Sequence, residues 1–396
     1  MSFYTSTSFF CALAVLVVPA AVLGLSGRRL APYGLGASVV MLAFLFSSSV
    51  AQLGAFLLFL ALSAAGTAAT LKSWQKGKKS LAVYRASLAA ALAPLVVYKL
   101  TVPMGTGLLG FVGISYLTFK SVQVIVEVRD GLITELSAFD WLYFLLFFPV
   151  FTSGPIDRSR RFVADAHRTW TRQEYADLLS KGVLLIFVGA VEQLVLATVF
   201  KTYYVPDRPL LANGLVYGVA RQVANAYLYA LYLFFDFAGY SLMAMGASYC
   251  FGIRTPQNFR APFAARNIKD FWNRWHITLS TWLRDFVFMR LTRWSTRHKL
   301  FGSRLGRACV GYLANMCLMG AWHGLTADYL VYGLYHGVLL AVNEVWEKRS
   351  RFYKAHHDAR WYQALSWFVT LQLVVVGFAI FSGQLGSVVG RLLSGA

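Results

Sequence analysis

The sequence predicts an all-α polytopic integral membrane protein. Of its 396 residues, 58% are hydrophobic and only 14% are charged, whereas soluble domains carry roughly 25% charged residues. Apolar stretches close to the ~20 residues that an α-helix needs to cross a bilayer recur along the whole chain. No soluble domain of useful size fits between these stretches. We therefore expect residues 1–396 to form a single integral membrane domain.

The apolar stretches provide about 11 candidate spans, although glycines and polar residues interrupt several of them. Basic residues gather in the loops between spans, as at Arg28, Arg29 and the run Lys72–Lys79. Positively charged loops stay on the cytoplasmic side of a membrane, so we expect these loops there. The candidate spans are 8–25, 33–50, 53–71, 84–101, 107–126, 139–153, 181–200, 214–235, 308–326, 327–345 and 363–382.

The window 139–153 is short for a full crossing. Five arginines follow it between residues 157 and 172. A re-entrant or half-span segment would keep these arginines on the cytoplasmic side, and irregular backbone is tolerated at membrane depth where protein covers it. We therefore predict a half-span here.

The middle of the chain departs from a simple bundle. Residues 254–305 contain 11 of the 37 basic residues and no 20-residue apolar window. Aromatic residues recur at helical spacing with a polar face beside them, which predicts a helix at the membrane interface or along a cavity. The aromatic stripe is Phe271, Trp275, Leu279, Trp282 and Phe286, and the polar face is Arg274, Thr278, Thr281 and Asp285.

The net charge is +20, from 37 Lys and Arg against 17 Asp and Glu. Cytoplasmic loops explain most of this excess. A surface of one sign also steers an acidic partner toward it. The run Lys72–Lys79 is too short for a nucleic-acid-binding arm, so the expected partners are membrane lipids and an acidic protein, with no nucleic acid.

His323 is the leading candidate for chemistry. It lies between Gly320 and Gly324 in an otherwise apolar stretch, and an imidazole at membrane depth is costly enough to suggest a function. The glycines remove bulk and allow a substrate or helix to approach, and Trp322 would supply a rigid wall. These features suit a general base in a narrow channel. A packing histidine bonded to a backbone carbonyl is the alternative.

Two other histidines are weaker candidates. His276 lies in the amphipathic segment, where it could orient a carbonyl, relay a proton or simply sit at the interface. His336 fits a structural role better. On one continuous helix it would lie about 20 Å from His323. The two could share a site only if the chain bends, which Gly324 and Gly333 permit.

Several common catalytic motifs are absent. The sequence contains no G-x-S-x-G elbow, no H-E-x-x-H zinc motif and no Walker loop. No cluster of Cys and His has metal-ligand spacing, so we expect no metal and no cofactor bound by this chain. A base without a nucleophile of its own fits direct transfer, in which the base deprotonates an acceptor hydroxyl that attacks an activated acyl donor.

Longer motifs carry a resemblance to a known family. The stretch Asp270–Asp285, with His323 following His276 by 47 residues, resembles the membrane-bound O-acyltransferase (MBOAT) family. Further stretches are similar to those of family members that act in D-alanyl-lipoteichoic acid synthesis, and the resemblance runs from about residue 110 to 340. These stretches are Gly113–Phe119, Glu127–Gly131, Ser153–Phe162, Phe235–Ser241 and Thr255–Phe263.

The resemblance implies an MBOAT-type ring of about 11 transmembrane helices, with re-entrant or amphipathic helices, around a central funnel. His323 matches the catalytic histidine of the family and His276 matches its second histidine. The substrate or funnel residues that follow from it are Trp275, Ser280, Trp282, Arg284, Asp285 and Trp322.

The resemblance also implies partners. The donor would be D-alanine held as a thioester on the phosphopantetheine arm of a small acidic DltC-like carrier protein. The acceptor would be lipoteichoic acid, a membrane-anchored DltD-like protein would assist, and the site would be the cell membrane of a Gram-positive-type bacterium. A basic patch suits carrier docking, or alternatively lipid headgroups. It comprises Met289, Arg290, Arg293, Arg297, Arg304 and Leu305.

Two other functions remain open at this stage. An alginate-type O-acetyltransferase would share the histidine motifs and act on a polysaccharide. A transporter or flippase would use its buried histidine and aspartate as a proton relay. Asp236 itself, at the end of an apolar span, is expected to pair structurally with an arginine such as Arg274 or Arg284, or to hydrogen-bond a helix terminus. Transporters of this kind commonly show paired halves, and the sequence contains no internal repeat.

Overall fold

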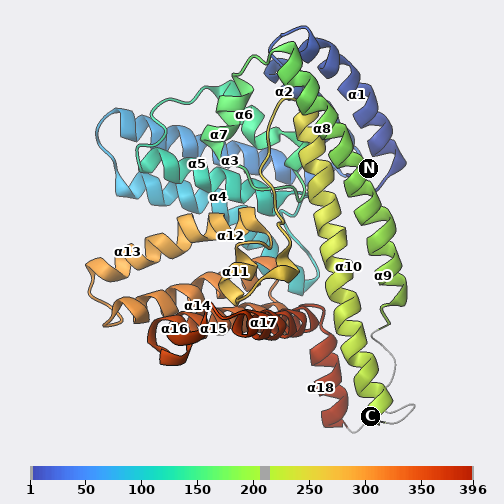
Figure 1. The fold of residues 1–396 in the computed structure, drawn as a ribbon. Helices are drawn as coiled ribbons and strands as arrows, with labels where there is room; N and C mark the ends of the chain where they lie inside the picture. The colour runs from blue at the N-terminus through green and yellow to red at the C-terminus, as the bar shows by residue number, and fades with distance from the viewer. Residues whose placement is uncertain (1–2, 206–214, 395–396) are drawn as a thin grey trace. The chain divides into compact units, whose positions relative to one another are not determined.

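The computed structural model describes residues 3–205 and 215–394, which excludes residue 214, the first of the predicted span 214–235. In these ranges every regular element is a helix, which confirms the all-α prediction (Figure 1). The chain divides into two compact units, and each is described by itself. Unit 1 comprises Met1–Val191 and Gly239–Gln257, and unit 2 comprises Glu192–Ala238 and Asn258–Ala396.

Unit 1 is built from the N-terminal helices. Serine hydroxyls accept hydrogen bonds from backbone N–H groups at the starts of three of them, through Ser6, Ser49 and Ser80, which satisfies donors that a helix leaves free. Its helices are α1 (Thr7–Leu25), α2 (Ala31–Phe46), α3 (Val50–Gln75), α4 (Leu81–Thr101), α5 (Ile114–Arg129), α6 (Ala138–Leu146), α7 (Ser159–Ala166), α8 (Arg172–Ala190), the 3₁₀ turns η1 (Val102–Met104) and η2 (Phe148–Val150), and the C-terminal end of α10 (Leu215–Cys250).

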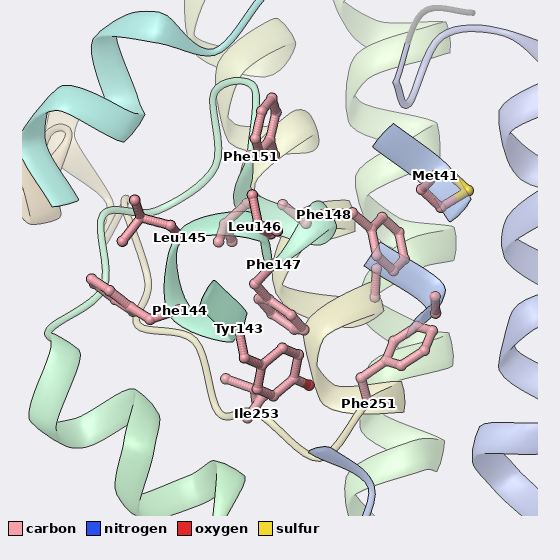
Figure 2. Packing of buried hydrophobic residues seen from close by; sticks show 14 of the residues in the cluster. Met41, Tyr143, Phe144, Leu145, Leu146, Phe147, Phe148, Phe151, Phe251 and Ile253 are labelled. Atoms are coloured by element: carbon pink, nitrogen blue, oxygen red, sulfur yellow. The ribbon is translucent and has the colours of Figure 1, made fainter. Parts of the chain in front are cut away.

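The predicted half-span is a short buried helix. Helix α6 has nine residues, about 14 Å at 1.5 Å per residue, which is too short to cross a bilayer. Its aromatic side chains Tyr143 and Phe144, with Phe147 and Phe148 after it, are at most 1% exposed, and Figure 2 shows them packed together in the core. Lys120 is 1% exposed and donates a 2.9 Å hydrogen bond to the carbonyl of Phe144.

One of the arginines that follow α6, Arg161, is tied to buried carboxylates together with the more distant Arg254. Asp165 is 3% exposed and accepts from Arg161 at 3.0 Å and from the Nε of Arg254 at 3.1 Å. Asp157, 1% exposed, accepts a 2.7 Å bond from the Nε of Arg161. Ion pairs of this kind fix the loop around α7 within unit 1, because leaving one buried partner alone is strongly unfavourable.

Six described helices are long and apolar enough to cross a membrane, which indicates a multi-pass membrane protein without confirming the count of 11. Helix α5 overlaps the predicted span 107–126 from residue 114 onward, but 14 of its 16 residues are buried within the protein. The six helices are Thr7–Leu25, Val50–Gln75, Leu81–Met104, Arg172–Tyr203, Val216–Cys250 and Arg360–Phe381.

Unit 2 holds the C-terminal half of the chain. Helices α14 and α15 form an antiparallel hairpin and α17 packs on α15 (Figure 1). Its elements are most of η3 (Val191–Ala197), α9 (Thr198–Tyr203), most of α10, η4 (Pro262–Ala264), α11 (Ile268–Trp272), α12 (Ile277–Leu283), η5 (Arg284–Phe288), α13 (Met289–Arg297), α14 (Arg304–His323), α15 (Ala327–Arg349), α16 (Arg351–His356), α17 (Arg360–Phe381) and α18 (Gln384–Ser394).

Glycines set the spacing of the α14–α15 hairpin. A Cβ at Gly320 would lie 2.4 Å from the carbonyl oxygen of Tyr329, and one at Gly333 would lie 2.5 Å from that of Met316. Because these neighbours are backbone atoms, only glycine allows the two helices this approach. The segment from His323 to His336 is therefore not one continuous helix, since α14 ends at His323 and the chain reverses before α15.

The predicted continuous amphipathic helix over 271–286 is wrong. The chain forms α11, leaves helical geometry, and starts α12 after His276. Four members of the predicted aromatic stripe, Phe271 to Trp282, are at most 5% exposed, so the stripe does not lie at an interface. Leu279 and Thr281 do line a cavity, which was the other predicted position. The helical spacing of the aromatic residues was predicted correctly, but the single continuous helix was not. Aromatic spacing alone does not reveal a break in the backbone.

Candidate functional site

His276 occupies a strained turn in unit 2. Its backbone has φ 43° and ψ 51°, in the left-handed region that side-chain-bearing residues rarely adopt. It precedes α12 directly and is 4% exposed. Such outliers persist only where the surroundings enforce them, and they gather at functional sites.

The enforcing residue is Asn258, which is 1% exposed. Its backbone carbonyl accepts a 2.9 Å hydrogen bond from the amide of Ile277, and its side-chain oxygen accepts a 2.6 Å bond from the hydroxyl of Thr278. The amide of Arg260 donates to the carbonyl of Arg274 at 3.0 Å. The extended segment that starts at Asn258 thus holds the turn from both sides, a role that the sequence did not reveal.

His323 is the last residue of α14. Gly324 caps the helix, and its amide donates a 3.2 Å hydrogen bond to the carbonyl of Gly320. A Cβ at Gly324 would lie 2.5 Å from the ring of Tyr329. The glycine that the sequence singled out therefore lets the start of α15 close over the histidine, which stays partly exposed.

The two histidines come together in unit 2 through Trp322. The ring of Trp322 lies 6.4 Å from that of His276 and 4.6 Å from that of His323, centroid to centroid. Burial, and next the charge of His323, hold the pKa of His276 well below its ordinary value. His276 is therefore a neutral imidazole near neutral pH, and its Nδ1 is buried with no hydrogen-bond partner among the described residues.

Aromatic rings form the remaining wall around His323. Phe381 meets it edge-on at 4.9 Å, and the rings of Tyr329 and Tyr332 lie 6.0 and 6.4 Å away. An imidazole with an accessible face inside an aromatic wall is sheltered from bulk water. That environment suits a base that must meet one substrate hydroxyl rather than water.

Asp236 does not pair with Arg274 or Arg284, so the structural pairing predicted from the sequence is wrong. Its carboxylate accepts a 3.3 Å hydrogen bond from Gln193. Arg274 instead pairs with Asp270 at 2.7 Å, and Arg284 pairs with its neighbour Asp285 at 2.9 Å. Each arginine finds an acid within four residues, which sequence reasoning about distant partners overlooked.

The other predicted funnel residues are divided between core and cavity. Trp275 is packed against Phe271 and Phe378, with centroids 5.7 and 4.8 Å away, and Trp282 stacks on Phe286 at 4.9 Å. These two tryptophans are 5% exposed and support the turn of His276. Ser280 and Arg284 line a cavity instead.

This cavity measures about 220 Å³ and lies among α11, α12, α14 and α15. Lys269 at its edge forms ion pairs with Glu347 at 2.6 Å and with Glu344. Asn315 is 9% exposed, and its side-chain oxygen has no hydrogen-bond partner in the described ranges. The cavity is lined by Lys269, Trp272, Asn273, Leu279, Ser280, Thr281, Leu283, Arg284, Phe288, Met289, Tyr312, Asn315, Met316, Met319 and Leu340.

The predicted basic patch forms α13 and the start of α14. Met289 lines the cavity and is 40% exposed, Arg293 and Arg297 are exposed, and Arg290 lies over the ring of Phe286 at 5.9 Å. Arg304 and Leu305 open α14. No acidic residue occurs from 286 to 327, and Met289 places the start of the patch at the cavity.

The fold and the histidine motifs define the class of protein. Residues 40–382 match the membrane-bound O-acyltransferase (MBOAT) family, and the chain belongs to this family. It is therefore an acyltransferase of the multi-pass membrane type. The match spans both units.

The similar curated proteins are acyltransferases with two acceptor types. The chain is 42% identical to a teichoic acid D-alanyltransferase of Bacillus subtilis over 393 residues, covering 97% of this chain and 98% of that one. It is 42% identical to one of Streptococcus thermophilus, over 74% of this chain and 73% of the relative. It is 32% identical to a probable alginate O-acetylase of Pseudomonas aeruginosa, over 69% and 49% respectively.

Proposed function

We propose that this membrane-bound O-acyltransferase moves D-alanine from a carrier-protein thioester to hydroxyl groups of lipoteichoic acid. The observation that carries the proposal is the constellation of His276, Trp322 and His323 in a chain that aligns nearly end to end with a teichoic acid D-alanyltransferase. The alginate O-acetylases share less identity over less of the chain, which favours D-alanine over acetate.

His323 acts as the general base in this proposal. Its imidazole takes the proton of an acceptor hydroxyl, and the oxygen attacks the thioester carbonyl carbon. The tetrahedral intermediate collapses as the carbon–sulfur bond breaks. The departing sulfur receives the proton from His323 and leaves as a thiol, so the base is regenerated and no acyl-enzyme forms.

In this proposal His276 stabilises the carbonyl oxygen of the thioester. A neutral imidazole whose free ring N–H points at the thioester oxygen stabilises the negative charge that develops there. Burial keeps the ring neutral, and the turn enforced by Asn258 fixes its direction. The unpartnered Nδ1 is a buried polar atom of the kind that finds its partner in a ligand.

The donor enters by the 220 Å³ cavity, and the acidic carrier docks on α13. A DltC-like carrier holds D-alanine on a phosphopantetheine arm, which suits a narrow cavity with a basic mouth. A membrane-anchored DltD-like protein completes the pathway, and the enzyme works in the cell membrane of a Gram-positive-type bacterium. The names of the curated relatives and the basic patch support this assignment.

The decisive experiment measures D-alanine incorporation into cell-envelope polymer at matched membrane levels. His323→Ala should reduce incorporation by about 10²-fold or more, the size of a lost general base, while His336→Ala stays active. Full incorporation by His323→Ala would remove the base from the mechanism. Acetate transferred by the purified enzyme in place of D-alanine would favour the alginate type.

Carrier docking has its own test. Charge reversal at Arg293 and Arg297 to Glu should weaken binding of purified acidic carrier and make that binding less dependent on salt, because fewer attractive charges remain to be screened. Lys78→Glu, an exposed cation in unit 1, is the matched control. Equal carrier affinity for wild type and the double variant would exclude α13 as the docking surface.

A further inference from the structure

A second cavity lies in unit 2, away from the histidines. It measures about 540 Å³ and opens between α15, α16 and α17, of which α15 and α17 pack side by side (Figure 1). We propose that this cavity binds one anionic phospholipid, with an acyl chain against α15 and α17 and the phosphate at Arg266 and Arg360. The proposal stands independently of the acyl-transfer reaction.

The inner wall is apolar and faces lipid. It is formed by Leu339 and Val342 of α15 and by Leu365, Val369 and Leu373 of α17. Val342, Leu365 and Val369 are 59%, 51% and 45% exposed, and α17 is one of the helices apolar enough to cross a membrane. Exposed aliphatic side chains on such a helix contact acyl chains, so the cavity continues the hydrocarbon phase into the protein.

The mouth is basic. Arg266 and Gln363 also line an adjoining hollow of about 320 Å³, which Arg360 borders as well. Both arginines are exposed, and neither guanidinium forms a hydrogen bond or ion pair with another described residue. Two uncompensated guanidinium groups facing one hollow at a membrane surface suit a phosphate, which accepts two parallel N–H donors from arginine.

The acids near the mouth leave this charge uncancelled. Asp270 is engaged with Arg274 at 2.7 Å and with the backbone amide of Arg266 at 3.2 Å, and Glu347 is engaged with Lys269 at 2.6 Å. Asp358 lines the cavity, but its side chain is 90% exposed and lies 3.3 Å from His357. Screening by water makes so exposed a carboxylate a weak competitor for the arginines.

The segment bearing Arg266 is fastened to α17. The indole N–H of Trp367 donates a 2.8 Å hydrogen bond to the carbonyl of Phe263, and the hydroxyl of Ser366 donates to the carbonyl of Arg266. The guanidinium is therefore positioned over the helix that forms the apolar wall. The positive charge of Arg266 and the apolar wall of α17 therefore lie at one place, as binding of a phospholipid requires.

Aromatic side chains complete the border. Trp346, Tyr353 and Tyr362 line the cavity, and the indole N–H of Trp346 donates a 3.1 Å hydrogen bond to the hydroxyl of Tyr362. Tryptophan and tyrosine concentrate where membrane meets water, because their rings are apolar and their tips are polar. This border marks the cavity as lying at headgroup depth. A water-soluble anion would leave its apolar wall unoccupied.

The test uses the purified full chain in lipid nanodiscs that contain phosphatidylglycerol and phosphatidylcholine, followed by mass spectrometry of retained lipid. The wild type should retain phosphatidylglycerol selectively. Arg266→Ala with Arg360→Ala should reduce this retention by about tenfold, whereas Lys76→Ala with Lys78→Ala, two exposed cations of unit 1, should not. Equal retention by both double variants would overturn the proposal.

The second test fills the cavity with a bulky side chain. Val369→Trp should expel the retained lipid, while Val376→Trp, at a 43% exposed position of the same helix outside the cavity, should leave it bound. Retention by Val369→Trp would mean that the lipid lies elsewhere and would overturn the site. Displacement of the lipid by excess inorganic phosphate would identify a phosphate-ion site and overturn the lipid assignment.

Discussion

The indole Nε1 of Trp272 donates a hydrogen bond of 3.3 Å to Nδ1 of His336. Since Nδ1 accepts, the proton of the neutral ring lies on Nε2. His336 is fully buried, and the rings of Tyr332 and Tyr335 lie 4.7 and 5.3 Å from it. This histidine is packed between α11 and the rest of α15, its Nε2 has no hydrogen-bond partner among the described residues, and the structural role expected from the sequence stays a prediction.

Replacement of His336 should therefore cost stability and spare chemistry. In His336→Ala the buried ring is lost and Trp272 loses its acceptor, so unfolding should become easier by about 2–4 kcal/mol. The folded fraction should still transfer acyl groups at a rate within a few fold of wild type. Thermal unfolding in detergent and the rate per folded molecule measure the two effects. A stable but inactive His336→Ala protein would place this histidine in the reaction.

Asn258 should act on the reaction through His276. Asn258→Ala removes the acceptor that the hydroxyl of Thr278 uses at 2.6 Å, which loosens the turn that presents the imidazole. We expect kcat to fall by about 10- to 100-fold, the equivalent of roughly 1–3 kcal/mol, with little change in KM for the donor. Steady-state transfer with varied donor concentration measures both constants.

A double variant separates positioning from general destabilisation. If Asn258 works through His276, then Asn258→Ala should add little to the loss already caused by His276→Ala. Thr278→Ser, which keeps the hydroxyl, is the matched control and should stay near wild type. Fully additive losses would indicate that Asn258 affects the fold rather than the histidine.

How far the sequence predicts this site depends on the kind of signal. Apolar windows located α14 and α15, and the family resemblance singled out His276 and His323, which the structure brings near one another through Trp322. The left-handed backbone of His276 could not be predicted, because the aromatic periodicity continues across the break between α11 and α12. The restraint responsible, Asn258, lies 18 positions away from His276; the family-like stretch Thr255–Phe263 contains it, but nothing in the sequence links it to the turn at His276.

The α14–α15 hairpin shows a second limit of prediction from the sequence. The sequence allowed a bend near Gly324 but could not decide whether one occurs. The deciding contacts are backbone to backbone, between Gly320 and Tyr329 and between Gly333 and Met316, and they exist only once both helices have formed. Close approach of this type is common between membrane helices that present small residues to each other.

Gly333 should accordingly tolerate no side chain. The Cβ of Gly333→Ala would meet the carbonyl oxygen of Met316 at 2.5 Å, which forces the hairpin apart beside His323, and overpacking of this kind costs about 1–3 kcal/mol. Gly36→Ala is the control, since a Cβ there has nothing within 4 Å and alanine favours the helix by up to about 1 kcal/mol. Thermal unfolding of both variants provides the comparison. Equal or greater stability of Gly333→Ala would contradict the packing of α14 on α15.

The buried imidazole of His276 should make stability depend on pH. Burial, with the charge of His323 second, lowers its pKa in the folded state, whereas the unfolded chain titrates near the ordinary value of about 6.5. Between these two values the unfolded state binds the extra proton. Stability contributed by the neutral ring is therefore complete above about pH 6.5 and is lost as pH falls, by up to about 1.4 kcal/mol per pH unit.

His276→Gln removes the titrating group while keeping a polar side chain of similar reach. Measured by thermal unfolding in detergent from pH 7.5 down to about pH 5, within the range where an ordinary histidine titrates, the wild type should lose stability faster than this variant. The difference between the two curves isolates His276, because every other titrating group is common to both proteins. Parallel curves would mean that His276 is already solvated and protonated at the lower pH. If the ring is as buried as its 4% exposure indicates, it stays neutral in the folded enzyme over this interval, so protonation of His276 should not lower the transfer rate of folded wild type there.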